Sequence, residues 1–372
     1  MINVFGSKVG EEEIRQVTES IGKQWMGMGP KTKQFEKEIA ERLHTDRFVL
    51  VDSGSNGLYM ALSLLNLPKG SEVIIPSFTW VSCAQVVMMA GCTPVFCDVD
   101  IQSQNITAEL VKPHITSNTG AIMAVHYAGL PVDLDPILEL GYPVIEDACH
   151  AIDSKYKGKS CGTVGAVGVY SFDAVKNLCM GEGGGVTSSN SEYMERANVL
   201  RYCGIGKSGF EASTHGKERW WEYNIVEPFI KMNPSDIAAG IGLAQLQKLD
   251  ELQEYRKKIW DIYQEEFREI SWIQTPMDAD TSRGDQHSYF TYFIRVPKRD
   301  QMAKYLFDNG IYTTLRYHPL HLNPLYQSKE SLPNSELLNE QGLNIPLHPS
   351  LSMDDVDQII HYCKKFGEEM KL

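Results

Sequence analysis

The sequence predicts an α/β protein with a large, doubly wound, mostly parallel sheet and a smaller C-terminal α+β domain. Short apolar runs alternate with helical patterns from residue 48 to about residue 200, which is typical of a parallel sheet covered on both faces. A long helical pattern then runs from Pro234 to about Phe267, and shorter strands and helices follow it. The chain has 372 residues, which is long for one hydrophobic core. Two domains are therefore expected.

The expected elements follow one another in a regular order. Helical patterns cover about 10–23 and 32–43, ahead of the first strand. The expected strands cover 48–51, 72–75, 93–98, 121–125 and 142–146, and another ends near Ser171; helices are expected at 58–65, after the second strand up to Ala90, and at 191–200. The C-terminal part should hold strands at 289–296 and 312–316 and helices at 300–309 and 353–369. We place the domain boundary near residue 250, with an N-terminal arm and large domain at 1–250 and a small domain at 251–372.

Composition excludes several classes of partner. The formal net charge is −13, which argues against nucleic acid as the main partner, because phosphate contacts need basic surface. No basic segment precedes an apolar core at the N-terminus, and the most apolar stretch, about 84–97, is too short and interrupted to span a bilayer. The eight cysteines form no CxxC pair and have no zinc spacing with histidine. We therefore expect a cytoplasmic protein with reduced thiols and no metal site.

The segment at 169–186, VYSFDAVKNLCMGEGGGV, combines a hydroxyl, an amine and a flexible backbone at the end of a strand. Ser171 ends the apolar run, Lys176 follows, and glycines cluster at 181–185. In open α/β sheets, ligands bind at the carboxyl ends of the strands. Our hypothesis is that Lys176 holds pyridoxal phosphate as a Schiff base and that Ser171 binds its phosphate. The simpler alternative is a glycine turn that carries a solvated lysine.

Three other strand ends carry residues that suit such a cofactor. Residues 52–57, DSGSNG, form a small-residue loop that opens a helix, where backbone N–H groups can bind phosphate, although most such loops are ordinary helix starts. Trp80 follows a strand and offers a flat face for a ring, or packs in the core. Asp147 ends PVIED and can either cap the next helix or face a protonated pyridine nitrogen, which keeps the ring an electron sink.

Several blocks, in this order, extend these observations along nearly the whole chain. They are SGSNGLYMAL at 53–62, PSFTWVS at 76–82, IEDACHA at 145–151, SFDAVKNLCMGEGG at 171–184, SDIAAGIGLAQL at 235–246, RYHPLHLNPLY at 316–326 and IPLHP at 345–349. With these blocks the chain resembles the DegT/DnrJ/StrS family of pyridoxal-phosphate-dependent sugar aminotransferases. The resemblance implies the fold-type I aminotransferase architecture and a homodimer whose active sites lie between the subunits.

The resemblance also implies a role for each matching position. Lys176 is the Schiff-base lysine, and Asp147 is the partner of the pyridine nitrogen. The remaining cofactor contacts implied are His150 at the ring hydroxyl, Trp80 stacked on the ring, and the Gly54 and Ser55 backbone with the Ser171 hydroxyl at the phosphate.

Two positions depart from the family pattern. Many members carry an asparagine that reaches the phosphate from the second subunit, whereas this chain has Lys231 there and Asn233 two residues later. A lysine at that position suits a phosphate. Cys203 stands where a histidine is common, which puts that local contact in doubt.

For function, the resemblance implies transfer of an amino group from glutamate or glutamine to a keto-sugar, usually nucleotide-linked, in amino-sugar biosynthesis for surface polysaccharide or a related glycoconjugate. Candidate substrate contacts are Arg316, His318 and His321, with a contribution from the polar loop at 202–219 through Lys207, His215 and Lys217.

Two other functions stay open from the sequence. A sugar dehydratase of the same fold replaces the lysine with histidine or uses an iron–sulfur cluster, whereas this chain has Lys176 and no cluster-like group of cysteines. A non-catalytic sensor or regulator would not need the complete set of cofactor residues. Turnover of an amino donor distinguishes the transferase from the sensor, and loss of sugar oxygen without gain of amine identifies the dehydratase.

Overall fold

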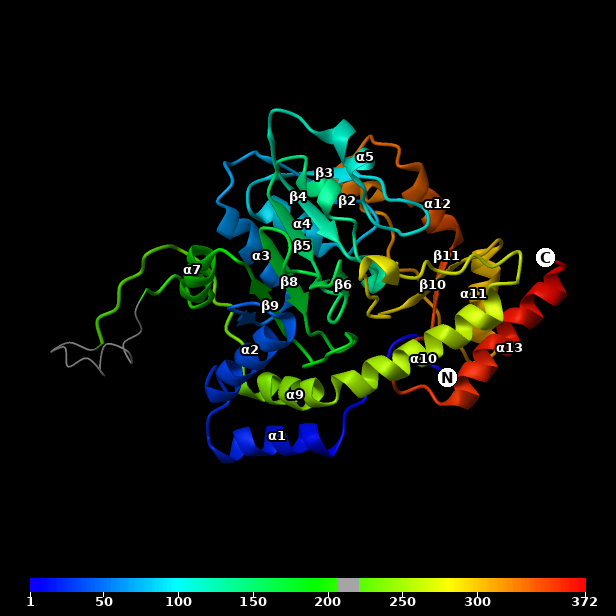
Figure 1. Ribbon diagram of the computed structural model, residues 1–372, viewed down its shortest axis with the longest axis horizontal. Coiled ribbons are helices and arrows are strands. Elements are labelled where there is room, and N and C mark those ends of the chain that lie inside the picture. The colour runs from blue at the N-terminus through cyan, green and yellow to red at the C-terminus, as the bar shows by residue number, and fades with distance from the viewer. Residues whose placement is uncertain (207–220) are drawn as a thin grey trace.

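A seven-stranded sheet forms the centre of the computed structural model, which describes residues 1–206 and 221–372 (Figure 1). The strand order is β1-β9-β8-β5-β4-β2-β3. Strands β8, β5, β4, β2 and β3 pair in parallel, and β9 lies antiparallel between β1 and β8. The bounds are β1 (Val49–Val51), β2 (Glu72–Pro76), β3 (Thr93–Cys97), β4 (Thr119–Val125), β5 (Val144–Asp147), β8 (Val167–Ser171) and β9 (Gly184–Thr187). The predicted mostly parallel sheet is confirmed.

Both faces of this sheet are buried, because alternate strand side chains enter different apolar clusters. In β1, Leu50 joins the cluster of α2, α5, α6 and α9, whereas Val49 and Val51 join the cluster of α3, α4 and α7. Helix α1 packs against α9 on the outside (Figure 1). The bounds are α1 (Glu11–Gly22), α2 (Pro30–Leu43), α3 (Gly54–Leu65), α4 (Ser82–Met89), α5 (Ala108–Val111), α6 (Asp135–Leu138), α7 (Ser191–Arg201) and α9 (Asp236–Gln247).

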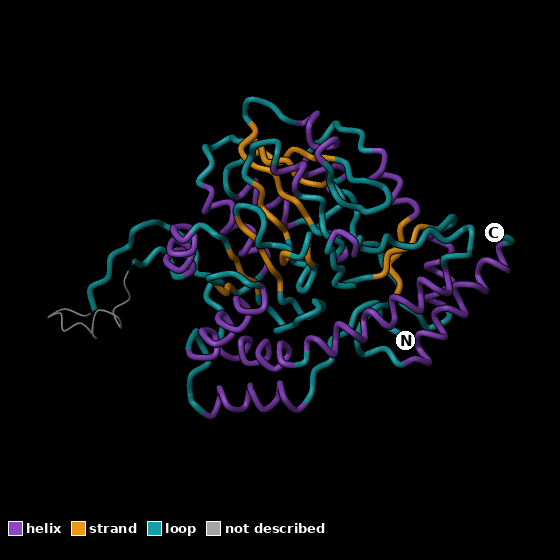
Figure 2. The backbone as a smooth tube through the Cα atoms, in the orientation of Figure 1, coloured by secondary structure: helices purple, strands orange, loops and turns teal. Residues whose placement is uncertain are grey.

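The C-terminal part has its own apolar cluster around a small antiparallel sheet of β10 (Tyr292–Arg295) and β11 (Gly342–Ile345). Its helices are α10 (Leu249–Phe267), α11 (Arg299–Asp308), α12 (Pro333–Gln341) and α13 (Met353–Met370), and α10 follows directly after α9 (Figure 2). Shorter elements are the hairpin β6 (Lys155–Tyr156) and β7 (Lys159–Ser160) and the 3₁₀ turns η1 (Lys112–His114), η2 (Tyr127–Gly129), η3 (Thr281–Arg283), η4 (Leu320–Leu322) and η5 (Pro324–Tyr326).

Two predicted helices differ from the structure. Helix α3 begins at Gly54, inside the predicted loop, because Ser53 caps it by accepting a hydrogen bond from the Asn56 N–H. The predicted helix from Pro234 to Phe267 is broken at Lys248, between α9 and α10. The domain boundary near residue 250 stays a prediction.

The predicted strand at 312–316 is wrong. Thr314 forms one isolated bridge to Asn344, and the partner of β10 is β11 instead. The ladder ends there because the Asn344 side chain, through Oδ1, accepts the hydrogen bond from the Arg316 N–H at 2.8 Å. Residues 312–316 are thus free to line a cavity.

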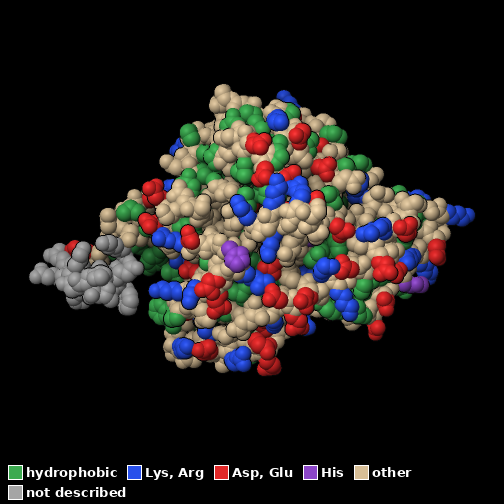
Figure 3. All heavy atoms as spheres, in the orientation of Figure 1, with side chains coloured by type: hydrophobic (Ala, Val, Ile, Leu, Met, Phe, Trp, Pro, Cys, Tyr) green, Lys and Arg blue, Asp and Glu red, His purple; other side chains and the backbone are tan. Residues whose placement is uncertain are grey.

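Acidic and basic side chains are interspersed over the face of the molecule in Figure 3. Within residues 1–206 and 221–372, every helix is too short or too polar to cross a membrane. The polar loop predicted at 202–219, with Lys207, His215 and Lys217, lies mostly outside the described residues.

Candidate active site

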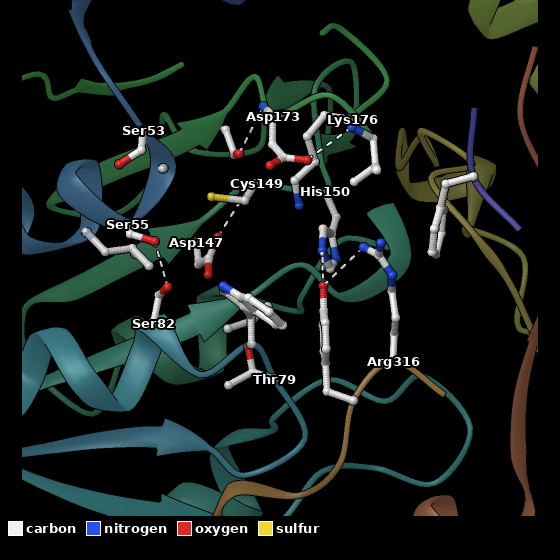
Figure 4. Close-up of a pocket in the computed structure, with 18 of the residues that line it drawn as sticks. Ser53, Ser55, Thr79, Ser82, Asp147, Cys149, His150, Asp173, Lys176 and Arg316 are labelled. Atoms are coloured by element: carbon white, nitrogen blue, oxygen red, sulfur yellow. Dashed lines mark hydrogen bonds between the residues drawn. The ribbon is translucent and has the colours of Figure 1, made fainter. Parts of the chain in front are cut away.

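A cavity of about 490 Å³ lies at the carboxyl ends of the parallel strands (Figure 4). Asp147 ends β5, Ser171 ends β8, and Lys176 follows in the next loop. Strand β1 runs parallel to β8, so α3, which follows β1, also begins at this edge. Because parallel strands end on one side, residues far apart in the sequence meet here.

Most of the predicted site residues line this cavity: Gly54, Ser55, Trp80, Asp147, His150, Ser171, Lys176 and Arg316. Three others lie elsewhere. The backbone of Lys231 pairs with that of Tyr202, His318 contacts Asn339 through Nδ1 at 2.9 Å, and buried His321 lies between Ser77 and Glu336. The roles assigned to all of these residues stay predictions, and a contact from Lys231 requires a second subunit.

The N-terminus of α3 forms a polar end to the cavity. The Ser53 hydroxyl accepts the hydrogen bond of the Asn56 N–H. The first N–H groups of the helix, those of Gly54 and Ser55, therefore remain available to bind an anion. A Cβ atom at position 54 would lie 2.7 Å from Ser171 Cβ and 3.3 Å from Cys149 Sγ, so the glycine keeps this end open. The Ser55 hydroxyl, 2.6 Å from that of Ser82, adds another polar group.

Asp147 is buried and held firmly. Its backbone pairs with β4 on one side and β8 on the other. The carboxylate accepts one hydrogen bond from the Cys149 N–H, at 3.0 Å, and another from the Cys83 thiol, at 3.3 Å. Burial, and next the negative charge of Asp147, raise the pKa of Cys83 well above its usual value. Cys83 therefore stays a neutral thiol beside the carboxylate.

Lys176 reaches the cavity from the loop after β8, and its amine lies 4.8 Å from the centre of the Phe290 ring. Burial lowers the pKa of Lys176, and the positive charge of Arg316 acts in the same direction. A lower pKa increases the uncharged fraction of the amine near neutral pH, and the uncharged amine is the nucleophilic form.

His150 packs face to face with Phe290 at 4.2 Å, and its Nε2 lies 3.0 Å from the Tyr317 hydroxyl. Burial, followed by the charges of Lys176 and Arg316, lowers the pKa of His150 well below its usual value. The ring is therefore neutral. Its Nδ1 is buried without a hydrogen-bond partner among the described residues, so it is available to a bound group.

Trp80 and Tyr317 form the aromatic side of the cavity. Their rings are 5.5 Å apart and tilted by 51°, and Trp80 remains 53% exposed. An exposed indole at a cavity mouth offers a face on which a planar ring can stack.

Sequence reasoning missed other cavity residues, among them Phe5, Ser82, Cys149, Asp173, Glu182 and Tyr317. Ser82, Cys149 and Tyr317 lie inside the blocks that carry the family resemblance, and their hydroxyl and thiol groups were a usable signal. Phe5 gave none, because it lies in the N-terminal segment, far in sequence from every strand end.

The fold and the site together define an aminotransferase of fold type I, with a lysine and an aspartate at the carboxyl edge of a mostly parallel sheet. The family model described as "DegT/DnrJ/EryC1/StrS aminotransferase family" matches residues 7–364. The chain belongs to this family.

Two relatives are similar over nearly their whole length. The spore coat polysaccharide biosynthesis protein SpsC of Bacillus subtilis is 36% identical, covering 95% of this chain and 93% of the relative. The dTDP-4-dehydro-2,3,6-trideoxy-D-glucose 4-aminotransferase of Saccharopolyspora spinosa is 34% identical, with 99% and 97% covered.

Two solved structures share the fold closely. The aminotransferase TlmJ of Streptoalloteichus hindustanus has a TM-score of 0.93 and 36% identity, with 100% of both chains covered. The putative sugar aminotransferase Spr1654 of Streptococcus pneumoniae, in its PMP form, has a TM-score of 0.93 and 28% identity, with 99% and 100% covered. The predicted family, fold and enzyme class are therefore confirmed.

The cavity fits pyridoxal phosphate on two observations. The end that Gly54 keeps open suits a phosphate. The unpartnered Nδ1 of His150 suits a ring oxygen.

Proposed function

We propose that this protein is a pyridoxal-phosphate-dependent aminotransferase that moves an amino group from glutamate, or glutamine, to a keto-sugar. The observation that carries the proposal is the position of Lys176 and Asp147 in one cavity, beside the helix N-terminus of α3. The acceptor is a nucleotide-linked keto-deoxysugar, and its product serves a surface polysaccharide such as a lipopolysaccharide O-antigen, or a related glycoconjugate. The activities named for the relatives from B. subtilis and S. spinosa support this choice.

Several of the predicted site residues that line the cavity have a task in this reaction. Lys176 would bind the cofactor aldehyde, Asp147 the pyridine nitrogen, His150 the ring oxygen, and the α3 N-terminus with Ser171 the phosphate. When bound, the cofactor supplies an electron sink for the carbon that loses a proton. The Nζ atom of Lys176, once freed by the amino donor, takes that proton and returns it at a neighbouring atom. Its lowered pKa keeps the uncharged form available for this step.

The proposal includes a cytoplasmic homodimer with shared active sites. Two large apolar side chains are exposed, those of Trp25 (58%) and of Ile230 (49%), and Ile230 directly precedes Lys231 in the sequence. Exposed apolar surface of this kind is typical of an interface. The eight cysteines are free, which suits a reducing compartment.

The test uses purified protein loaded with pyridoxal phosphate. Borohydride should fix the cofactor on Lys176, as located by peptide mass spectrometry, and attachment at another lysine would contradict the assignment. L-Glutamate should then convert the bound cofactor to its amine form with release of one equivalent of 2-oxoglutarate. A panel of free and nucleotide-linked keto-sugars should identify the acceptor by incorporation of ¹⁵N from labelled glutamate. The Lys176→Ala variant should fold but transfer no amine, and retained transfer would refute the role of Lys176.

A further inference from the structure

Tyr317 lines the cavity, and the reaction proposed above leaves its hydroxyl group without a task. The ring lies between two others, with its centre 5.5 Å from that of Trp80 and 6.0 Å from that of His150. The hydroxyl oxygen is 3.0 Å from His150 Nε2 and 3.4 Å from Arg316 Nη1 (Figure 4). Tyr317 therefore connects a cation to the histidine that faces the predicted cofactor.

The chemistry of the neighbours sets the direction of these two hydrogen bonds. A guanidinium has donors and no acceptor, so Arg316 donates to the Tyr317 oxygen. Burial raises the pKa of Tyr317 to about 12, and the hydroxyl therefore keeps its proton at neutral pH. Among the described residues, His150 Nε2 is the one acceptor within hydrogen-bond distance of that proton. Tyr317 thus donates to His150, and no donor of the pair is left without an acceptor.

This direction decides which ring nitrogen of His150 carries a proton. The ring is neutral, because burial lowers its pKa well below the usual value, and a neutral imidazole has a single N–H. Since Nε2 accepts the Tyr317 hydroxyl, the proton is on Nδ1. Nδ1 is also the nitrogen that is buried without a partner among the described residues. His150 therefore presents an N–H, rather than a lone pair, to a bound group.

Both rings are held in place. His150 packs between Phe290, at 4.2 Å and 18° from parallel, and Tyr317, at 23° from parallel. The backbone next to Tyr317 is attached on two sides, because the Arg316 N–H donates to Asn344 Oδ1 at 2.8 Å and the Tyr127 hydroxyl donates to Arg316 O. The Tyr317 hydroxyl is thereby fixed relative to β11 and to the turn after β4.

We propose that the Tyr317 hydroxyl positions His150 as its Nδ1–H tautomer, so that His150 donates a hydrogen bond to the ring oxygen of the bound cofactor. This inference rests on the proposed function, because it concerns the cofactor of the same site. A donor stabilises negative charge on that oxygen, whereas a bare nitrogen would direct its lone pair at it. Tyr317 is a positioning residue, since it acts through His150.

The first test reads the tautomer directly. Protein that contains ¹⁵N-labelled histidine is studied by long-range ¹H–¹⁵N correlation, which distinguishes a protonated ring nitrogen from a bare one. The chain has ten histidines, and the signals that disappear in His150→Gln identify those of His150. In the apoprotein and in the protein loaded with pyridoxal phosphate, Nδ1 should be protonated and Nε2 bare. A protonated Nε2 with a bare Nδ1 would overturn the inference.

The second test removes the hydroxyl alone. Tyr317→Phe keeps the aromatic ring, and its His150 should lose the fixed tautomer and show protonation of Nε2 in part of the molecules. Tyr255→Phe is the matched control, because it removes a hydroxyl that donates one hydrogen bond, to Leu351 O at 2.6 Å, outside the cavity. The control should keep the wild-type tautomer. An unchanged tautomer in Tyr317→Phe would show that Tyr317 does not set it.

The third test follows the bound cofactor by its visible absorbance at a series of pH values. A donor to the ring oxygen favours the deprotonated, anionic state of the linked cofactor, so loss of the donor should raise the pH midpoint of the absorbance change. We expect a rise of about half to one pH unit in Tyr317→Phe, as for one neutral hydrogen bond, and a larger rise in His150→Ala. The charged residues of the cavity are the same in every variant.

A double variant shows whether Tyr317 acts through His150. Tyr317→Phe added to His150→Ala should leave the midpoint where His150→Ala alone places it, because the residue that Tyr317 positions is already absent. Tyr255→Phe should leave the wild-type midpoint unchanged. If Tyr317→Phe does not shift the midpoint, or if the double variant shifts it by the sum of the two single changes, the inference is overturned.

The inference and the proposed function fail in different ways, because the tautomer is read in the apoprotein. If His150 carries its proton on Nδ1 and Tyr317→Phe alters this, but the wild type transfers no amine, the proposed reaction is wrong and the tautomer stands. If the wild type transfers amine and His150 carries its proton on Nε2, only the inference is wrong.

Discussion

The amine of Lys176 lies in the active-site cavity, and burial is the main cause of its lowered pKa. Nearby charges act in both directions: Arg316 lowers the pKa, whereas the carboxylates of Asp147 and Asp173 raise it. An ordinary lysine titrates near ~10.4, so at neutral pH almost all of it is charged. The surroundings of Lys176, rather than the lysine itself, therefore determine how readily it reacts.

This leads to a pH prediction for Lys176. The rate at which apoprotein captures pyridoxal phosphate should rise with pH through a midpoint below the ordinary lysine value of ~10.4, because deprotonation of the amine becomes possible at lower pH. In Arg316→Met the midpoint should move upward, since a cation that disfavours the charged amine is lost. Stopped-flow absorbance at a series of pH values measures the midpoint. Arg268→Met is the control, because Arg268 is exposed and lies outside the cavity, and it should leave the midpoint unchanged. An unshifted midpoint in Arg316→Met would contradict the electrostatic coupling between Arg316 and Lys176.

The sequence supported individual site residues to different degrees. Lys176, Asp147 and Ser171 were predictable because each lies at or just after the end of an apolar strand, and parallel strands bring such ends together. Arg316 was only one of several candidates, and the structure alone separates it from His318 and His321, which do not line the cavity. Phe5 could not be found, because its place at the cavity depends on long-range packing that leaves no local pattern.

At the scale of elements, α3 is organised around its first turn. Ser53 caps the helix, and Gly54 lies where a side chain would meet Ser171 and Cys149. The sequence predicted a phosphate-binding loop here but placed the helix start too late, because its small residues are typical of loops. The predicted strand at 312–316 failed because the local pattern does not reveal that the Asn344 side chain, from β11, accepts the hydrogen bond of the Arg316 N–H.

We predict that Gly54→Ala weakens pyridoxal phosphate binding by about tenfold or more, because the new methyl group would lie 2.7 Å from Ser171 Cβ. Equilibrium titration of the apoprotein by absorbance measures the affinity, and thermal unfolding of the same samples reports stability. Gly22→Ala is the control, since it makes the same change in helix α1 with no atom within 4 Å of the new methyl. Undiminished affinity in Gly54→Ala would show that this helix end does not hold the phosphate.

At the scale of the whole molecule, the fold brings most of the predicted cofactor residues to one cavity but leaves Lys231 outside it. Lys231 follows the exposed Ile230, and its backbone pairs with Tyr202, just before the residues that the structure leaves undescribed. The alternation of strands and helices predicted the architecture of a subunit, because the pattern is set by burial on both faces of the sheet. Contacts between subunits leave no such periodic pattern, and the expected phosphate contact by Lys231 stays a prediction.

Mixing two inactive variants tests whether the active sites are shared. Lys176→Ala removes the reactive amine from a subunit's own cavity, and Lys231→Glu places a negative charge at the partner's phosphate. If Lys231 acts across the interface, each mixed dimer has one intact site, and refolding the two variants together in equal amounts should restore about a quarter of wild-type activity, given random pairing. Lys176→Ala mixed with Asp147→Asn is the control, because both residues serve the cavity of their own subunit and every site stays damaged. Restoration in the control as well, or in neither mixture, would mean that Lys231 does not complete the site of a neighbouring copy.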